Sequence, residues 1–167
     1  MLNLQSLITK PIKELFMKSR SVLCTFLILC IFCYHVSGQD SPVKLKKEKF
    51  NINKAGEDQI GYAQAVKVGN TIYISGSVGW GKMDDALKLA YDEIDKTLKN
   101  YNASFANVVK ENLYTTALDS VIKYKDIRLK YYENDYPAAT WVEVKRLYNP
   151  GIIVEVEVVA VLPEEKK

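Results

Sequence analysis

Alternation of apolar and polar residues predicts a β-hairpin near the start of the folded part of the chain. Residues 63–68 and 71–75 each carry apolar side chains at every second position, and Gly69-Asn70 stands between them. A Gly-Asn pair supplies the positive φ angles that a tight turn needs. Residues 76–81 contain three glycines, so we expect a loop there in which the backbone passes close to another group.

Apolar residues at steps of three and four predict two helices, at residues 83–101 and 121–132. Two aspartates in the first turn of the first helix suit the positive end of the helix dipole. We expect Asp119 or Ser120 to cap the second helix, because both side chains can accept a hydrogen bond from a free backbone N–H.

Period-two patterns predict three further strands, at residues 108–116, 139–145 and 152–161. In the last two, valines occupy one face, and we expect that face to pack on the helices. The opposite face is mixed in polarity, which indicates a wet subunit interface or a cleft. It comprises Trp141, Glu143, Ile153, Glu155 and Glu157. With a short strand near Phe50, the pattern predicts an α+β fold: a mixed sheet with two helices on one face.

Residues 1–38 have the layout of a secretory signal peptide. Met17 to Arg20 is a basic region, residues 22–34 are almost entirely apolar, and Val36 to Gly38 is a cleavage-like stretch of small residues. The apolar run is shorter than the roughly 20 residues of a membrane-spanning helix. We expect an exported protein, periplasmic or secreted. An uncleaved leader that acts as a membrane anchor is the alternative, and Met17 is an alternative start.

The rest of the chain divides into a polar linker at 39–49, a single domain at 50–163 and a charged tail at 164–167. All cysteines and the one histidine fall in the leader, so the mature chain needs no disulfide. Their absence also excludes a Cys or His nucleophile, a Ser-His-Asp triad and a His/Cys zinc site.

Charge gives no indication of a nucleic-acid partner. The leader carries four of the 23 basic and one of the 20 acidic residues, which leaves 19 of each in the mature chain and a net charge of zero. Binding to a phosphate backbone depends mainly on Lys and Arg, so a neutral domain disfavours it.

Several segments resemble the RidA/YjgF family, also called the endoribonuclease L-PSP family. They are residues 60–76, 103–110, 137–147 and 154–157, and the resemblance extends over residues 50–162. It implies a chorismate-mutase-like fold and a homotrimer in which the mixed sheet faces form a central barrel, with three clefts between subunits. It also implies hydrolysis of reactive enamines and imines to a keto acid and ammonia, without a cofactor.

The resemblance also assigns roles to residues of this chain. Tyr62 matches a pocket tyrosine, although the turn before it is one residue shorter than in the family. Ser75 and Gly76 match a serine and a glycine that line the pocket. Asp119 stands where the family often has asparagine, and Glu155 matches a glutamate associated with the attacking water.

Two positions depart from the family pattern. Ala139 replaces the arginine that clamps the substrate carboxylate, and Trp141 replaces a small residue that faces the cleft. Loss of one charged hydrogen bond costs roughly 1.5–3 kcal/mol, or about 10- to 100-fold in rate or affinity. Arg146 is no obvious substitute, whereas Lys110 or Lys145 from a neighbouring subunit could take over.

The sequence therefore favours an imine or enamine hydrolase whose substrate preference is altered by the missing arginine. The alternative is a non-catalytic trimer that binds a small aromatic or acidic metabolite in the same cleft. Ribonuclease activity rests only on the older family name. At the level of residues, Glu155 could position water or pair across the barrel, and Tyr62 could line the cleft or pack in the hairpin. Trp141 could stack on a ligand or fill the volume of the lost arginine.

Overall fold

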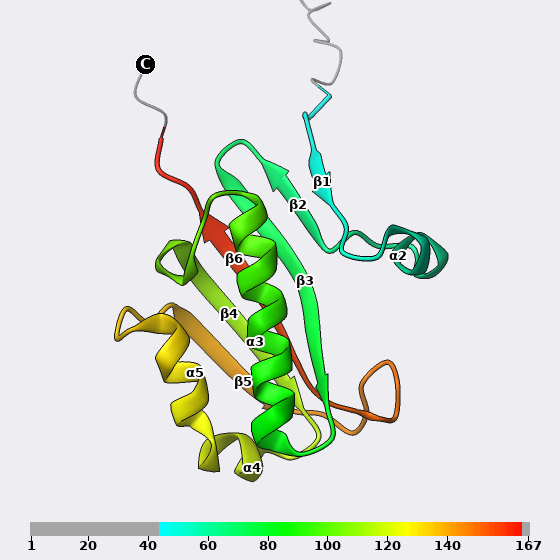
Figure 1. The fold of residues 1–167 in the computed structure, drawn as a ribbon, viewed down its shortest axis with the longest axis vertical. Helices are drawn as coiled ribbons and strands as arrows, with labels where there is room; N and C mark the ends of the chain where they lie inside the picture. The colour runs from blue at the N-terminus through cyan, green and yellow to red at the C-terminus, as the bar shows by residue number, and fades with distance from the viewer. Residues whose placement is uncertain (1–43, 165–167) are drawn as a thin grey trace, which may run out of the picture. The chain divides into compact units, whose positions relative to one another are not determined.

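A computed structural model describes residues 44–164, which fold around one six-stranded sheet (Figure 1). The strand order is β1-β2-β3-β6-β4-β5. β4 and β5 pair in parallel, and all other neighbours are antiparallel. The strands are β1 (Glu48–Phe50), β2 (Ala65–Val68), β3 (Thr71–Trp80), β4 (Val108–Thr115), β5 (Ala138–Glu143) and β6 (Ile152–Val161). The helices are α2 (Lys54–Ile60), α3 (Met83–Asn100), the short 3-10 helix η1 (Phe105–Asn107), α4 (Leu118–Lys123) and α5 (Lys125–Tyr132).

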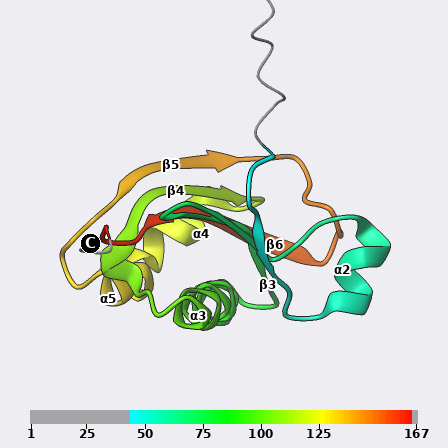
Figure 2. The same ribbon diagram turned by 90° about the horizontal axis from the view of Figure 1, so that it is seen from above.

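The core lies between the sheet and the helices on one of its faces. Figure 2 shows α3 and α5 on the same side of the sheet, with the opposite side uncovered by any helix of the described residues. Val154, Val156 and Val158 of β6 are at most 2% exposed and lie on the helix side. The predicted α+β sheet, with helices on one face and the valines of β6 toward them, is therefore confirmed.

The second predicted helix is two short helices, and its predicted cap is wrong. Tyr124 separates them, as the C-cap of α4 and the N-cap of α5. Neither Asp119 nor Ser120 caps α4, whose N-cap is Ala117 without a side-chain hydrogen bond. Glu143 of β5 accepts a hydrogen bond from the Leu118 N–H at 2.8 Å instead. A carboxylate from a neighbouring strand thus satisfies a donor that local sequence cannot satisfy.

The predicted glycine-rich loop is also wrong, because β3 continues to Trp80. Its pairing with β6 shifts register between Ile74 and Ser77 and again at Gly79. The expected close approach is present, since a Cβ on Gly79 would lie 2.7 Å from Cα of Ala86 in α3. Glycine therefore keeps the strand against the helix here, where we expected a loop.

The face assignment made for β5 is wrong as well. Trp141 pairs with Leu113, which is fully buried on the helix side. Ala139, Trp141 and Glu143 therefore share the helix side, and Val142, which is 40% exposed, lies on the open side. β5 is an edge strand with both faces partly exposed, so its alternation does not report which side the helices cover.

Two further predictions concern the ends of the chain. The predicted leader and residues 165–167 of the predicted tail lie outside the described residues. Within residues 44–164, none of the helices has the length and apolar character that crossing a membrane requires. β1 begins at Glu48, inside the segment predicted as a linker.

Candidate active site

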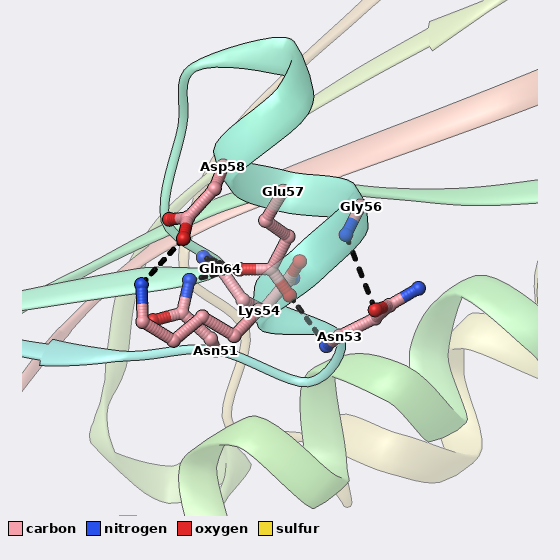
Figure 3. Close-up of polar contacts among 7 residues, drawn as sticks. All are labelled: Asn51, Asn53, Lys54, Gly56, Glu57, Asp58 and Gln64. Atoms are coloured by element: carbon pink, nitrogen blue, oxygen red, sulfur yellow. Dashed lines mark hydrogen bonds and ion pairs between the residues drawn. The ribbon is translucent and has the colours of Figure 1, made fainter.

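Tyr62 is held by a short helix that the sequence patterns did not reveal. Glu57 of α2 is 3% exposed. Its carboxylate accepts backbone hydrogen bonds from Asn53 at 2.7 Å and from Gln64 at 2.9 Å (Figure 3). It also accepts one from the Ile52 N–H at 2.7 Å. Burial alone would raise the pKa of Glu57, but these bonds and one from Asn51 together lower it. The donors include residues that precede α2 in the sequence and one that follows it, so Glu57 stabilises the whole segment from Ile52 to Gln64, which contains Tyr62.

The second half of β3 forms a free edge beside this segment. β2 pairs with β3 only as far as Ile74. Beyond it, Ser75 donates its backbone N–H to Gln64 O at 2.9 Å and its hydroxyl to Ala63 O at 2.8 Å. The Gln64 side-chain amide donates to Ser77 Oγ at 3.1 Å. These contacts hold the Ser75-Gly76 backbone beside Ala63 and Gln64, which directly follow Tyr62.

Glu155 lies directly over Gly76. A Cβ added to Gly76 would lie 2.6 Å from both Cγ and Cδ of Glu155, so only glycine leaves room for this carboxylate. Burial and, secondly, the neighbouring Glu157 raise the pKa of Glu155. The Glu155 carboxylate makes no hydrogen bond with any described residue, whereas Glu157 accepts from Asn112 Nδ2 at 2.7 Å and Tyr114 Oη at 3.2 Å. Two glutamates on one strand face therefore differ: Glu157 is held by two side-chain hydrogen bonds, whereas the Glu155 carboxylate has no partner among the described residues.

Carboxylates also surround Tyr62. Burial raises the pKa of Tyr62, and the charges of Glu57, Glu93 and Glu155 raise it further. The Tyr62 hydroxyl therefore keeps its proton at neutral pH. Burial also raises the pKa of Glu93 on α3, against a hydrogen bond with Ser77 that lowers it. Neither Glu57 nor Glu93 was singled out from the sequence: α2, which carries Glu57, gave no periodic pattern, and Glu93 occupies an ordinary polar position of α3.

The remaining predicted residues form a separate group at the other end of the sheet. Ala139 and Trp141 lie on β5, which is two strands from β6, or roughly 10 Å at the usual strand spacing. They face the helices, whereas Glu155 faces the open side. Asp119 is an exposed residue in the first turn of α4. One chain therefore brings together Tyr62, Ser75, Gly76 and Glu155, and not Asp119, Ala139 or Trp141.

A buried polar cluster, which we call the Glu111 cluster, lies beneath this second group. Glu111 of β4 is fully buried, and its carboxylate accepts from Arg128 Nε at 2.8 and 3.1 Å and from Trp141 Nε1 at 3.0 Å. The hydroxyls of Tyr91 and Tyr132 donate to it at 3.0 and 2.7 Å. A buried carboxylate is stable only when its lone pairs are used in this way.

Ionisation in the Glu111 cluster follows from these contacts. Burial and then the Glu111 charge raise the pKa values of Tyr91 and Tyr132, so both remain neutral donors. Burial alone would lower the pKa of Arg128, but Glu111 raises it, and the guanidinium stays charged. We did not predict this pair. Two sequence features could have indicated it. Glu111 alternates in step with Leu113 and so shares its buried strand face, and Arg128 lies four residues before Tyr132 and so shares its helix face.

The open face of the sheet carries a shallow hollow of about 190 Å³. Its lining includes Tyr73, Lys110, Asn112 and Glu157, and Glu155 is next to it rather than in it. Within the described part of the chain, no three His, Cys, Asp or Glu side chains are grouped so that they could hold a metal ion.

Comparison with known proteins adds a family to this geometry. The family model described as endoribonuclease L-PSP matches residues 53–162. A RutC family protein of Pyrococcus abyssi is 29% identical over 70% of this chain and 98% of its own length. A 2-iminobutanoate/2-iminopropanoate deaminase of Bos taurus is 32% identical over 60% of this chain and 79% of its own length. The chain belongs to the RidA/YjgF family.

Solved structures of this family share the fold. A YjgF-family protein from Mycobacterium tuberculosis is 24% identical and superposes with a TM-score of 0.65. The match covers 70% of this chain and the full length of the other protein. A protein from Thermotoga maritima is 22% identical, covers 74% of this chain over its full length, and gives a TM-score of 0.59. The RidA/YjgF sheet, with its helices on one face, is thus common to all three.

Proposed function

We propose that this RidA/YjgF-family chain hydrolyses reactive imines, and enamines after tautomerisation, to a carbonyl compound and ammonia. The observation that carries the proposal is Glu155, a half-buried carboxylate with a raised pKa and no hydrogen bond to the described residues, over the Gly76 backbone. A base of this kind is suited to accept a proton from water near neutral pH. The deaminase named among the relatives acts on imines, which supports the same reaction class.

The reaction needs one water and two proton transfers in each direction. Glu155 takes a proton from water as the water oxygen bonds to the imine carbon, and Tyr62 donates its proton to the imine nitrogen. In the resulting carbinolamine, Glu155 returns its proton to nitrogen, the C–N bond breaks and ammonia leaves. The hydroxyl proton passes back to Tyr62 as the C=O bond forms. Nothing is oxidised or reduced, so the step needs no cofactor.

We propose that the complete cleft lies between subunits of a homotrimer. Within one chain, Glu155 lies on the open face of the sheet, whereas Ala139 and Trp141 of β5 lie on the helix side. A site that contains all three therefore needs residues from two chains. The open sheet face supports this assembly, because large side chains such as Tyr73, 53% exposed, stand on it without a covering helix. Ala139 would then alter substrate preference, since it offers no charge to the ligand.

The direct test is ammonia release from imines supplied to the purified mature protein. We expect Glu155→Gln to lower the rate by roughly 10²- to 10⁴-fold, the usual contribution of a general base. Glu157→Gln is the matched control on the same strand face and should change the rate only a few-fold. If wild-type protein accelerates hydrolysis of neither 2-iminobutanoate nor a neutral imine, the proposed activity is wrong. Equal rates in the two variants would remove Glu155 from the mechanism.

A second candidate function is ligand binding without turnover. It is supported by the charged and aromatic residues around Trp141, which lie apart from Glu155 within one chain. Saturable binding of a small metabolite, with no ammonia release from any imine, would favour this function over catalysis.

We also propose export, with cleavage after residue 38. The supporting feature is the order of basic, apolar and small residues in the leader. N-terminal sequencing of the protein from fractionated host cells tests it. A mature protein that begins near Gln39 in the exported fraction is the expected result, and an intact leader in the cytoplasm contradicts it.

A further inference from the structure

Arg128 is a buried cation that is only partly used by its partner. The residue is 6% exposed, and its Nε donates to both carboxylate oxygens of Glu111. Its two terminal nitrogens form no hydrogen bond with any residue between 44 and 164. No fully enclosed polar side-chain atom in that range lacks a partner, so these nitrogens reach the surface. Their four N–H groups have no hydrogen-bond acceptor among the described residues.

Aromatic rings surround this guanidinium. Its Cζ lies 4.6 Å from the ring centre of Tyr132, 5.4 Å from Trp141 and 6.0 Å from Tyr136. Tyr136 is 48% exposed, so the guanidinium lies just beneath the surface at this point. The rings restrict the guanidinium, and Glu111 fixes its Nε side. The terminal edge is therefore held in one orientation before any ligand arrives.

The same place lies over the helix-facing side of β5. Glu111, which binds Arg128, pairs in register with Ala139, and Trp141 reaches Glu111 from two residues further along. Ala139 is exposed and has only a methyl group as its side chain, so β5 presents no large side chain at this position.

We propose that the terminal edge of Arg128 binds the carboxylate of a small substrate or ligand. This inference rests on the proposed function for the identity of the substrate as an imino acid, and it assigns charge recognition to helix α5. Two parallel N–H groups match the two oxygens of a carboxylate. The Glu111 cluster is neutral overall, with one cation and one anion. It therefore suits a single negative charge better than a phosphate dianion.

The test measures binding separately from turnover. The probe is 2-oxobutanoate, the keto acid that hydrolysis of 2-iminobutanoate would yield, and the neutral comparison is 2-oxobutanamide. In a Trp80→Phe background, Trp141 is the only tryptophan, so its indole N–H signal in NMR reports the site alone. We expect this signal to shift and saturate with the acid, and affinity for the amide to be about 10- to 100-fold weaker.

Two variants keep the test independent of folding. Arg128→Lys keeps the charge but loses the planar edge, and should weaken binding about 10-fold or more. Arg128→Met combined with Glu111→Gln removes both charges while an amide oxygen still accepts from the tyrosines, and should abolish detectable binding. Lys125→Met, on the exposed side of α5, is the matched control for lost charge and should bind as wild type does.

Each outcome decides something. Equal affinity for acid and amide, unchanged affinity in the Arg128 variants, or no shift of the Trp141 signal with folded wild-type protein overturns the inference. Binding that depends on Arg128 without any imine hydrolysis supports the inference and contradicts the proposed function. Hydrolysis whose KM for 2-iminobutanoate is unaffected by Arg128→Lys supports the function and contradicts the inference.

Discussion

Gly76 and Gly79 stand three residues apart on β3, and their replacement by alanine should have opposite consequences. At Gly76 the new methyl group would lie 2.6 Å from Cγ and Cδ of Glu155, which is the movable side chain proposed as the base. At Gly79 it would lie 2.7 Å from Cα of Ala86, which is backbone inside a long helix. Non-bonded carbon atoms prefer about 3.5–4.0 Å, so in each case something must move by roughly 1 Å.

The magnitudes follow from what can move. In Gly76→Ala the Glu155 side chain can swing away, so the free energy of unfolding should change by less than about 1 kcal/mol. Displacing a catalytic group by about 1 Å costs roughly 100-fold in rate, equivalent to about 2.7 kcal/mol. In Gly79→Ala helix α3 must shift from the sheet, an overpacking that costs about 1–3 kcal/mol of stability.

Two measurements separate these effects. Urea denaturation gives the free energy of unfolding of each variant, and ammonia release from 2-iminobutanoate under native conditions gives the rate. We expect Gly76→Ala to be stable and slow, and Gly79→Ala to be less stable with a nearly normal rate per folded molecule. The reasoning is refuted if Gly76→Ala keeps the wild-type rate, or if the two variants lose stability equally.

Three further predictions concern charge and assembly. The fold lowers the pKa of Glu57, so the stabilisation by its carboxylate is present above pH 4.5 and is lost on acidification. In urea denaturation, Glu57→Gln should therefore reduce the change in the free energy of unfolding between pH 3 and 6. Asp58→Asn, at an exposed position, should leave that change as it is in wild type. The pKa of Glu155 is raised instead, so the contribution of Glu155 to stability should fall as pH rises above 4.5, and Glu155→Gln should be the more stable protein at pH 7 but not at pH 3. If the cleft combines two chains, co-refolded Glu155→Gln and Arg128→Lys subunits should be more active than either variant alone, and no such gain would place the site within one chain.

The sequence predicted most of the fold because the helices and the central strands follow clear periodic patterns. α3 and the valines of β6 lie where a period of 3.6 or two placed them. The misses have physical causes. α2 has seven residues, too few for a periodic signal, and is held by Glu57 through contacts that no local pattern encodes. β5 is an edge strand, for which alternation carries little information.

The candidate site could be predicted only in part, and for the same reason. Tyr62, Ser75, Gly76 and Glu155 were identified from segments that resemble the family, and the chain brings them together. The Glu111–Arg128 pair was missed because its partners lie on a strand and a helix 17 residues apart, and neither residue falls in those segments. Pairing across elements is set by tertiary packing, which a single sequence does not display.

The position of the cation in this chain bears on how its substrate preference could change. An arginine at position 139 would supply the positive charge for a substrate carboxylate from the strand itself. With Ala139 in its place, another cation has to supply that charge. Arg128 comes from a helix and is oriented by Glu111, so in the proposed site its terminal edge would depend on a buried acid that makes no contact with the ligand. A change at Glu111 should therefore alter carboxylate affinity without removing any contact to the carboxylate. That dependence distinguishes a cation held for recognition from one that merely neutralises a buried acid.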